Sequence, residues 1–347
     1  MLDIRDLQGF KKNKEAMAEL VFDYDLKDTP SVMSIKEKYL QDTLYTMRFL
    51  SISLEMNEPI LFANYMKWFG KLAYYLKFDL DSMNRHFDVC KTIFNQQLEA
   101  TFYQKVYSIF DFGITEFNTS YTNPKHRNPL ISLFLQYLIE MDIDQAYDII
   151  RDKMASGMTL QQIYLEILQP TLYEVGELWQ QRIITVAKEH YITAAIQNII
   201  GKLYPYVFRE HNQKTYSMTG VCAGNEMHEI GMRMTTDFFE LSGWDTTFLG
   251  SNLPIDLIVE HLIEYPTDLL AISATTLNHL VDLKELIHTV KQNEKLNHIK
   301  IIVGGKVFND TPHLWKNIGA DGFAEDAEQA ILIANLIVGE THDKTSK

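Results

Sequence analysis

Residues 268–305 read DLLAISATTLNHLVDLKELIHTVKQNEKLNHIKIIVGG, and this stretch decides the fold of the C-terminal part of the chain. Two short apolar runs, DLLAIS and IKIIVGG, flank VDLKELIHTVKQN, in which apolar residues recur at helical spacing. Strands that alternate with helices of about 10–15 residues are typical of a parallel sheet covered by helices on both faces. The alternation begins at SMTGVCA (217–223) and continues through DTTFLG (245–250) to the segment 319–339. We therefore predict a doubly wound, flavodoxin-like (Rossmann-like) domain over residues 211–347.

Helical spacing dominates the sequence before this domain. Up to residue 125, apolar residues recur every three or four positions, as in Leu61, Tyr65, Phe69 and Leu72. The segment FNTSYTNPKHRNP (117–129) then gathers Asn, Thr, Ser and Pro, as linkers do. We place a domain boundary there and predict an all-helical N-terminal domain over residues 1–125, with a role in sensing or interaction.

The middle of the chain, residues 126–210, is predicted to be a four-helix bundle. Thr159 and Thr185 stand directly before apolar-periodic runs, where N-cap residues are favoured, and Pro205 is expected to close the block. Short connections favour antiparallel neighbouring helices. The four helices are predicted at residues 130–141, 143–156, 159–178 and 186–203.

Composition excludes several classes of protein. The chain has 347 residues, of which 46 are acidic and 32 basic, so its formal charge of −14 offers no basic footprint for nucleic acid. Cys90 and Cys222 are too few and too far apart for a disulfide framework or a cysteine-based zinc site. No run of 18 apolar residues and no signal peptide is present. We expect a cytoplasmic protein that binds neither nucleic acid nor membrane.

The end of the first predicted strand carries the pattern that points to chemistry. In GVCAGNEMHEIG (220–231), Glu226, His228 and Gly231 are spaced E-x-H-x-x-G just before a helix. A histidine on such a loop can ligate a metal through one ring nitrogen while a carboxylate orients the other. A solvent-facing or capping histidine would give the same pattern, so the motif is weak when taken alone.

Two further strand ends fall at the same edge of the sheet, where doubly wound folds bind ligands. One strand ends in Ser273 and Thr275, and the next ends in Gly304 and Gly305. Hydroxyls supply hydrogen bonds, and small residues let a large ligand lie close to the backbone. Each feature alone could be a helix cap or a turn, but the three together favour a ligand site.

These residues resemble the cobalamin-binding domain of corrinoid proteins, whose pattern is D-x-H-x-x-G, S-x-L and G-G. The resemblance covers residues 215–340 and implies His228 as the lower axial cobalt ligand, with the cofactor's nucleotide tail inserted past the other two strand ends. Glu226 replaces the family's Asp, which should preserve the orientation of the histidine. Thr275 replaces its Leu, and this alters the contact to the tail.

The predicted bundle carries a second resemblance. Trp179 is followed by Glu189 and His190 in a W-x9-E-H arrangement, which looks like the signature of light-sensing regulators that bind adenosylcobalamin. The resemblance implies that the bundle caps the upper face of the corrinoid. An indole can cover an adenosyl group, and the carboxylate and imidazole can bind its polar edges. Gln180 stands where those regulators carry a histidine that can take the upper cobalt site after photolysis.

The N-terminal domain does not look like the winged helix-turn-helix fused to those regulators. Its aromatic residues indicate core or dimer packing, and an additional bilin chromophore is the minority interpretation. His86 and His126 stand alone in the sequence and carry no ligand prediction. The aromatic residues concerned are Tyr65, Trp68, Phe69, Tyr74 and Tyr75.

The leading hypothesis is a non-enzymatic cobalamin sensor, in which light cleaves the cobalt–carbon bond of adenosylcobalamin and changes contacts with a protein partner or a second subunit. One alternative is a corrinoid methyl carrier of a methyltransferase system, which needs an accessible upper face. The others are a photosensor with an additional bilin and an interaction protein with a degenerate corrinoid motif.

Overall fold

The computed structural model describes residues 4–28, 30–122, 128–207 and 216–345 and divides into two compact units, residues 1–124 and 125–347. The predicted all-helical N-terminal part, helical cap and C-terminal parallel sheet are all confirmed. The predicted boundary between residues 210 and 211 lies outside the described residues, as does His126. None of the described helices is long and apolar enough to span a membrane.

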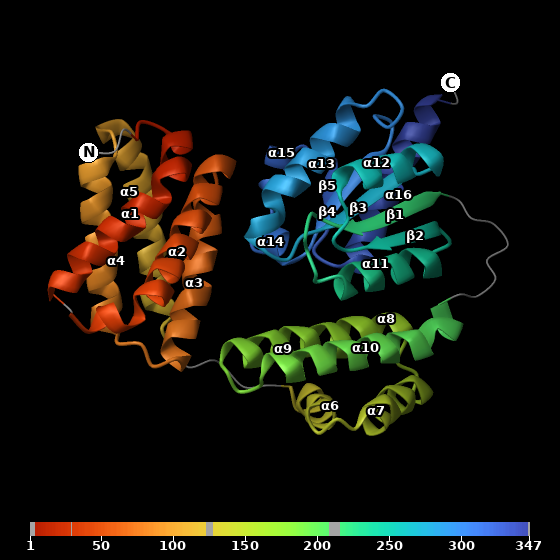
Figure 1. The fold of residues 1–347 in the computed structure, drawn as a ribbon. Helices are drawn as coiled ribbons and strands as arrows, with labels where there is room; N and C mark the ends of the chain where they lie inside the picture. The colour runs from red at the N-terminus through yellow and green to blue at the C-terminus, as the bar shows by residue number, and fades with distance from the viewer. Residues whose placement is uncertain (1–3, 29, 123–127, 208–215, 346–347) are drawn as a thin grey trace. The chain divides into compact units, whose positions relative to one another are not determined.

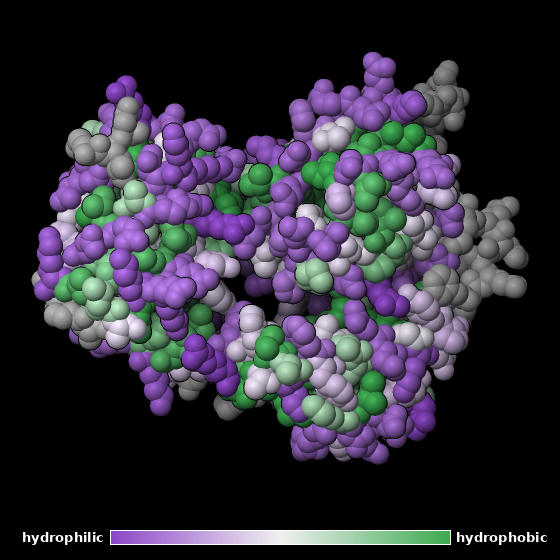
Figure 2. All heavy atoms as spheres, viewed as in Figure 1, coloured by the Kyte–Doolittle hydropathy of each residue, from purple (hydrophilic) through white to green (hydrophobic). Residues whose placement is uncertain are grey.

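The N-terminal unit is built from helices whose starts follow from local chemistry. Asp79 accepts a hydrogen bond from the Ser82 amide, Glu99 caps the next helix, and Pro59 occupies a first-turn position. In Figure 2, hydrophilic residues cover much of this unit's visible face. The helices are α1 (Leu7–Asp28), α2 (Lys36–Met56), α3 (Pro59–Tyr75), α4 (Leu80–Gln97) and α5 (Ala100–Ser120), with a 3₁₀ turn η1 (Pro30–Ile35).

Aromatic side chains fill the core of this unit. Phe62, Phe110 and Phe117 are almost fully buried, and Phe49 stacks on Tyr65 with 4.1 Å between ring centroids. Among the aromatic residues singled out in the sequence, Tyr65 is therefore a core residue. Others in that group, such as Trp68 and Tyr74, are partly exposed.

His86 is not isolated, contrary to the expectation from the sequence. Its Nδ1 lies 2.9 Å from Asp25 Oδ2 and 2.7 Å from the Tyr39 hydroxyl, and its Nε2 lies 3.7 Å from Cys90 Sγ. These partners come from α1, α2 and α4, so pairs distant in the sequence form one buried polar network. Both cysteines, Cys90 and Cys222, are free and buried.

In the C-terminal unit, four helical segments form the cap. Thr159 forms a capping box with Gln162, and Thr185 accepts a hydrogen bond from the Lys188 amide, as predicted for both threonines. Figure 1 shows the cap helices below the sheet. They are α6 (Pro129–Ile139), α7 (Ile143–Ala155), α8 (Leu160–Ile163) continued by a π-helical turn η2 (Tyr164–Leu168) and α9 (Gln169–Gln180), and α10 (Val186–Val207).

Two prolines explain where the cap departs from the predicted helices. Pro170 has no N–H to bond the preceding turn, and the chain widens to a π-helical turn, closed by the Gln169 amide on the Tyr164 carbonyl. Pro205 does not end the block, because α10 continues to Val207. Because Pro205 has no N–H, the carbonyl of Gly201, four residues earlier, does not receive the usual helical hydrogen bond. Gly201 is exposed, so water can reach this carbonyl.

The sheet has the predicted doubly wound topology. Its five parallel strands lie in the order β2-β1-β3-β4-β5, with α11 and α16 over one face and α12, α13 and α15 over the other (Figure 1). The strands are β1 (Ser217–Cys222), β2 (Asp245–Gly250), β3 (Leu269–Ser273), β4 (Lys300–Gly304) and β5 (Gly322–Phe323). The helices are α11 (Ile230–Leu241), α12 (Ile255–Glu264), α13 (Leu280–Gln292), α14 (Lys306–Asn309), α15 (Leu314–Ile318) and α16 (Ala327–Thr345), with a 3₁₀ turn η3 (Leu277–His279).

Gly70 provides a test of the packing between α3 and α5 in the N-terminal unit. A Cβ on Gly70 of α3 would overlap the carbonyl oxygen of Phe117 on α5, so Gly70→Ala should destabilise the unit by about 1–3 kcal/mol through overpacking. Gly201→Ala is the matched control, because a Cβ there meets nothing and alanine is the better helix former by about 1 kcal/mol. Thermal unfolding followed by circular dichroism should show a lower midpoint for the first variant only. Equal midpoints would contradict the close approach of α3 and α5.

Candidate functional site

Strand register brings the three predicted strand ends together. Cys222 of β1 is level with Ser273 of β3, and Ser273 is level with Gly304 of β4. The segments that follow these strands therefore leave the sheet side by side. This is the carboxyl edge at which doubly wound sheets bind ligands.

The loop after β1 presents one histidine to solvent over one buried carboxylate. Gly224 turns the chain at φ +54°, a conformation that glycine adopts without steric cost. The Glu226 side chain is fully buried, whereas 61% of the His228 side chain is exposed. His228 therefore projects outward while its partner lies in the protein.

Glu226 joins this loop to the end of β3. Its Oε1 accepts hydrogen bonds from the His228 ring Nδ1 and, at 3.1 Å, from the His228 amide. Its Oε2 accepts from the amides of Thr275 at 2.8 Å and Thr276 at 3.3 Å. Both oxygens are occupied, so the carboxylate fixes the ring orientation and leaves Nε2 of His228 as its outward-facing nitrogen.

The electrostatics of the pair agree with this geometry. Burial raises the pKa of Glu226, but hydrogen bonds from His228 and the Thr275 amide outweigh it and lower the pKa to about 2. The pKa of His228 is raised, first by its hydrogen bond to Glu226, against the effect of burial, and then by the charges of Glu226 and Glu189. Because Glu189 belongs to the cap, a cap residue also contributes to the raised pKa of His228.

Glycines at the neighbouring strand ends let backbone segments approach each other closely. Gly305 has φ +98°, and a Cβ on it would lie 2.5 Å from the Ala274 carbonyl oxygen. A Cβ on Gly304 would lie 3.3 Å from the Ala324 carbonyl oxygen. Gly231, at the start of α11, has no neighbour within 4 Å of such an atom. A larger residue there would project into open space beside the histidine.

A cavity of about 730 Å³ lies between this edge and the cap. That volume is typical of ligand sites, and its lining is mostly apolar. Nine of the ten residues predicted for the site line it, and the tenth, Glu226, lies buried behind the histidine. The nine are Trp179, Glu189, His190, His228, Gly231, Ser273, Thr275, Gly304 and Gly305. Their contacts to a cofactor stay predictions.

The cap wall of the cavity carries the predicted aromatic and polar groups. Trp179, at the end of α9, is 46% exposed. At the start of α10, Glu189 Oε2 lies 2.5 Å from His190 Nδ1, and Glu189 Oε1 accepts a hydrogen bond from the Thr193 hydroxyl at 2.9 Å. A second carboxylate-oriented histidine therefore borders the same cavity, with 75% of its side chain exposed.

The sequence did not reveal several residues that shape the site. Tyr164 lines the cavity from the π-helical turn, and its hydroxyl donates to the buried Asp237 of α11 at 2.9 Å. Burial raises the pKa of Asp237 to about 6, although hydrogen bonding by Tyr164 and the charge of Arg233 oppose this. The only signal for Tyr164 in the sequence is the proline six residues later, because its partner is 73 positions away.

Comparisons with known proteins agree with this site. Residues 216–332 match a family model described as a B12 binding domain, and residues 130–204 match a second model with the same description. The site and fold are therefore those of a corrinoid-binding protein with a helical cap. Residues 130–204 and residues 216–332 of this chain therefore each carry a B12 binding domain.

The individual proteins that resemble this chain are named as corrinoid proteins. A corrinoid protein of Desulfitobacterium hafniense is 26% identical over 204 residues, which are 58% of this chain and 89% of that protein. Dimethylamine corrinoid protein 2 of Methanosarcina acetivorans is 26% identical over 172 residues, 49% of this chain and 76% of that one. The structure of a monomethylamine corrinoid protein of Methanosarcina barkeri shares the fold, with a TM-score of 0.52 at 19% identity over 60% of this chain and 97% of that one.

These findings confirm the prediction of a cobalamin-binding domain and give no support to light sensing, adenosylcobalamin or a bilin. The donor set of the described residues fits the cofactor. They hold no group of three or more His, Cys, Asp or Glu side chains that could bind a metal ion. One outward-facing histidine suits a metal that brings most of its ligands with it, as cobalt in a corrin ring does.

The Glu226–His228 pair makes a measurable prediction in the cofactor-free protein. Titration of the His228 ring by NMR should give a pKa above 6.5, because the hydrogen bond to Glu226 favours the protonated ring. Glu226→Gln should lower that pKa, since burial is then opposed only by the charge of Glu189. Glu229→Gln is the matched control, because the Glu229 carboxylate contacts Gln197 and Ser251 instead. An unchanged pKa in the Glu226 variant would contradict the pairing.

Proposed function

We propose that this protein holds cobalamin in the cavity, with His228 below the cobalt and the cap above the corrin ring. The observation that carries this is the exposed His228 ring, oriented by the buried Glu226 at the carboxyl edge of the sheet. Ser273 and the Gly304–Gly305 pair, next to it in register, line the same cavity, and the nucleotide tail would lie along them. When bound, cobalamin supplies a cobalt atom that accepts and releases an alkyl group at its upper face.

The finer role that the comparisons favour is that of a corrinoid methyl carrier in a methyltransferase system. The relatives are named as corrinoid proteins, among them a dimethylamine corrinoid protein. In such a role this chain performs no chemistry with its own side chains. His228 would bind the cobalt, and Glu226 holds the proton of the histidine ring at Nδ1. The cap excludes water from the upper face of the corrin ring until a partner enzyme binds.

The substrate of such a system is set by partner enzymes that deliver and remove the methyl group. The N-terminal unit lies outside the matched residues, and we propose it as the part that recognises such a partner or a second subunit.

The second candidate is a sensor that binds adenosylcobalamin, and a specific observation favours it. Trp179, Glu189 and His190 all line the cavity on the cap side, opposite the strand ends. A methyl group is too small to need an indole and a carboxylate–imidazole pair. An adenosyl group would use all three, and its loss would change the contacts of the cap.

Upper-ligand preference separates the two roles. For a methyl carrier, we expect the protein in dim red light to bind methylcobalamin and hydroxocobalamin with similar affinity and adenosylcobalamin no more tightly. Trp179→Ala should then change all three affinities by less than about threefold. Binding is measured by titration followed by absorbance, and Tyr206→Ala, an exposed aromatic residue on α10, is the matched control.

The opposite result favours the sensor. Adenosylcobalamin would then bind most tightly, and Trp179→Ala would weaken it alone by about five- to a hundredfold, the range expected for a lost aromatic contact or polar pair. That outcome would overturn the methyl-carrier assignment. No uptake of any cobalamin would overturn both.

A further inference from the structure

Helix α11 carries three charged residues at intervals of four, and each meets a polar side chain of the cap. Glu229 stands directly before the helix, and Arg233 and Asp237 follow one and two turns later. Residues four apart lie above one another on a helix surface, so the three form one row. We call this row and its cap partners the ladder.

Each contact between a charged residue of this row and the cap is called a rung, and the first rung lies at the cavity. Gln197 of α10 donates to Glu229 Oε1 at 3.2 Å, and Ser251 donates to Glu229 Oε2 at 2.8 Å. Gln197 and Glu229 both line the cavity. Glu229 is the residue after His228, so this rung connects the loop of the metal ligand to the cap.

The second rung lies outside the cavity lining, and the third reaches the cavity through Tyr164. Arg233 donates to the Tyr204 hydroxyl from Nε at 3.1 Å and from Nη2 at 2.8 Å, and its guanidinium lies 5.0 Å from the Tyr204 ring centroid. Tyr164 donates to the buried Asp237. Hydrogen bonds to charged groups are stronger than those between neutral groups.

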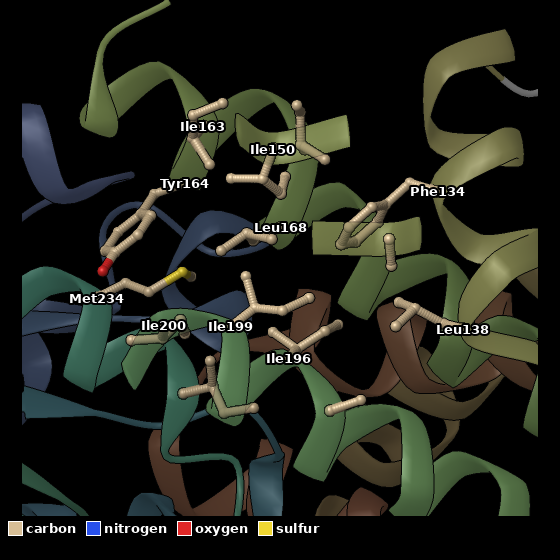
Figure 3. Packing of buried hydrophobic residues seen from close by; sticks show 14 of the residues in the cluster. Phe134, Leu138, Ile150, Ile163, Tyr164, Leu168, Ile196, Ile199, Ile200 and Met234 are labelled. Atoms are coloured by element: carbon tan, nitrogen blue, oxygen red, sulfur yellow. The ribbon is translucent and has the colours of Figure 1, made fainter. Parts of the chain in front are cut away.

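An apolar row runs beside the ladder. Ile230, Met234 and Phe238 of α11 belong to the same buried cluster as the cap residues, and Figure 3 shows Met234 among Tyr164 and Ile200. Apolar contacts hold the two parts together without direction. The polar rungs have defined donor and acceptor atoms, so they fix the position of the cap along α11.

The other end of the cap is more exposed. At the turn between α9 and α10, Ile183 is 61% exposed and Val186 is 52% exposed, and Trp179 beside them borders the cavity. The cap is therefore fastened along α11 and open to solvent at this turn. An opening motion would leave the α11 side in place and move the turn away from the cavity.

We propose that the ladder sets the closed position of the cap over the bound cofactor, and that Glu229 is the positioning residue that links the state of the His228 loop to the cap. The proposal rests on the cobalamin-binding part of the proposed function and holds for a carrier and for a sensor. Ligation of His228 fixes its loop, the adjacent Glu229 carboxylate follows, and Gln197 then holds α10. Release of the histidine loosens the same contact.

Ligand exchange at the upper face tests the first half of the proposal. The full chain is loaded with hydroxocobalamin and mixed with cyanide, and absorbance reports the rate at which cyanide enters. Gln197→Leu removes the first rung, and Tyr204→Phe removes an acceptor that lies outside the cavity lining. Both should exchange about threefold to tenfold faster than the wild type, because the cap opens more often.

Asn198→Leu, an exposed position on the same helix, is the matched control and should exchange at the wild-type rate. Wild-type rates in both ladder variants would overturn the proposal while the proposed function stands. Failure of the wild type to take up hydroxocobalamin would instead overturn the proposed function.

A double-mutant cycle tests the link through Glu229. Amide hydrogen exchange in α10 is measured with cofactor bound in the wild type, His228→Ala, Gln197→Leu and the double variant. If Glu229 transmits the state of His228, each single change raises exchange and the double change adds nothing further. Additive effects would show that Gln197 and His228 act independently and would overturn the link.

Discussion

The hydrogen bonding of one buried carboxylate, Glu226, is the constraint on which the site depends. An ionised carboxylate away from water is costly unless it is fully bonded. Glu226 meets this condition with the His228 ring and with amides at the end of β3. The bonds that compensate its burial also orient the histidine and clamp two strand ends together, so stability and ligand geometry depend on the same atoms.

The cap completes the site by enclosing it from the opposite side. One apolar cluster joins the cap to α11, and the sheet has a second cluster of its own, so α11 is the element that packs the cap onto the sheet domain. Because the cavity is mostly apolar, its few polar groups decide what can bind there. Glu189 and His190 on the cap form a second carboxylate–imidazole pair, like that of Glu226 and His228 at the sheet edge.

The sequence predicted the parts of the site that depend on local spacing. The strand, the turn and the E-x-H pattern lie within 15 residues, so local spacing alone was enough to pair Glu226 with His228. Local signals also predicted Thr159 as an N-cap residue. Tyr164–Asp237 and His86–Asp25 could not be found in this way, because their partners lie 73 and 61 positions apart and depend on tertiary packing. Pro205 was misread as a helix end, since α10 continues to Val207 and the carbonyl that loses its helical partner belongs to the exposed Gly201.

The central claim is that His228, rather than the nucleotide base of the cofactor, ligates the cobalt. Electron paramagnetic resonance of bound cob(II)alamin tests it directly, because a nitrogen ligand below the cobalt splits each line according to its nuclear spin. In protein made with ¹⁵N-histidine and loaded with unlabelled cofactor, the account predicts that the threefold ¹⁴N splitting becomes a twofold ¹⁵N splitting. A threefold splitting that persists would show that the cofactor's own base remains bound and would contradict the account.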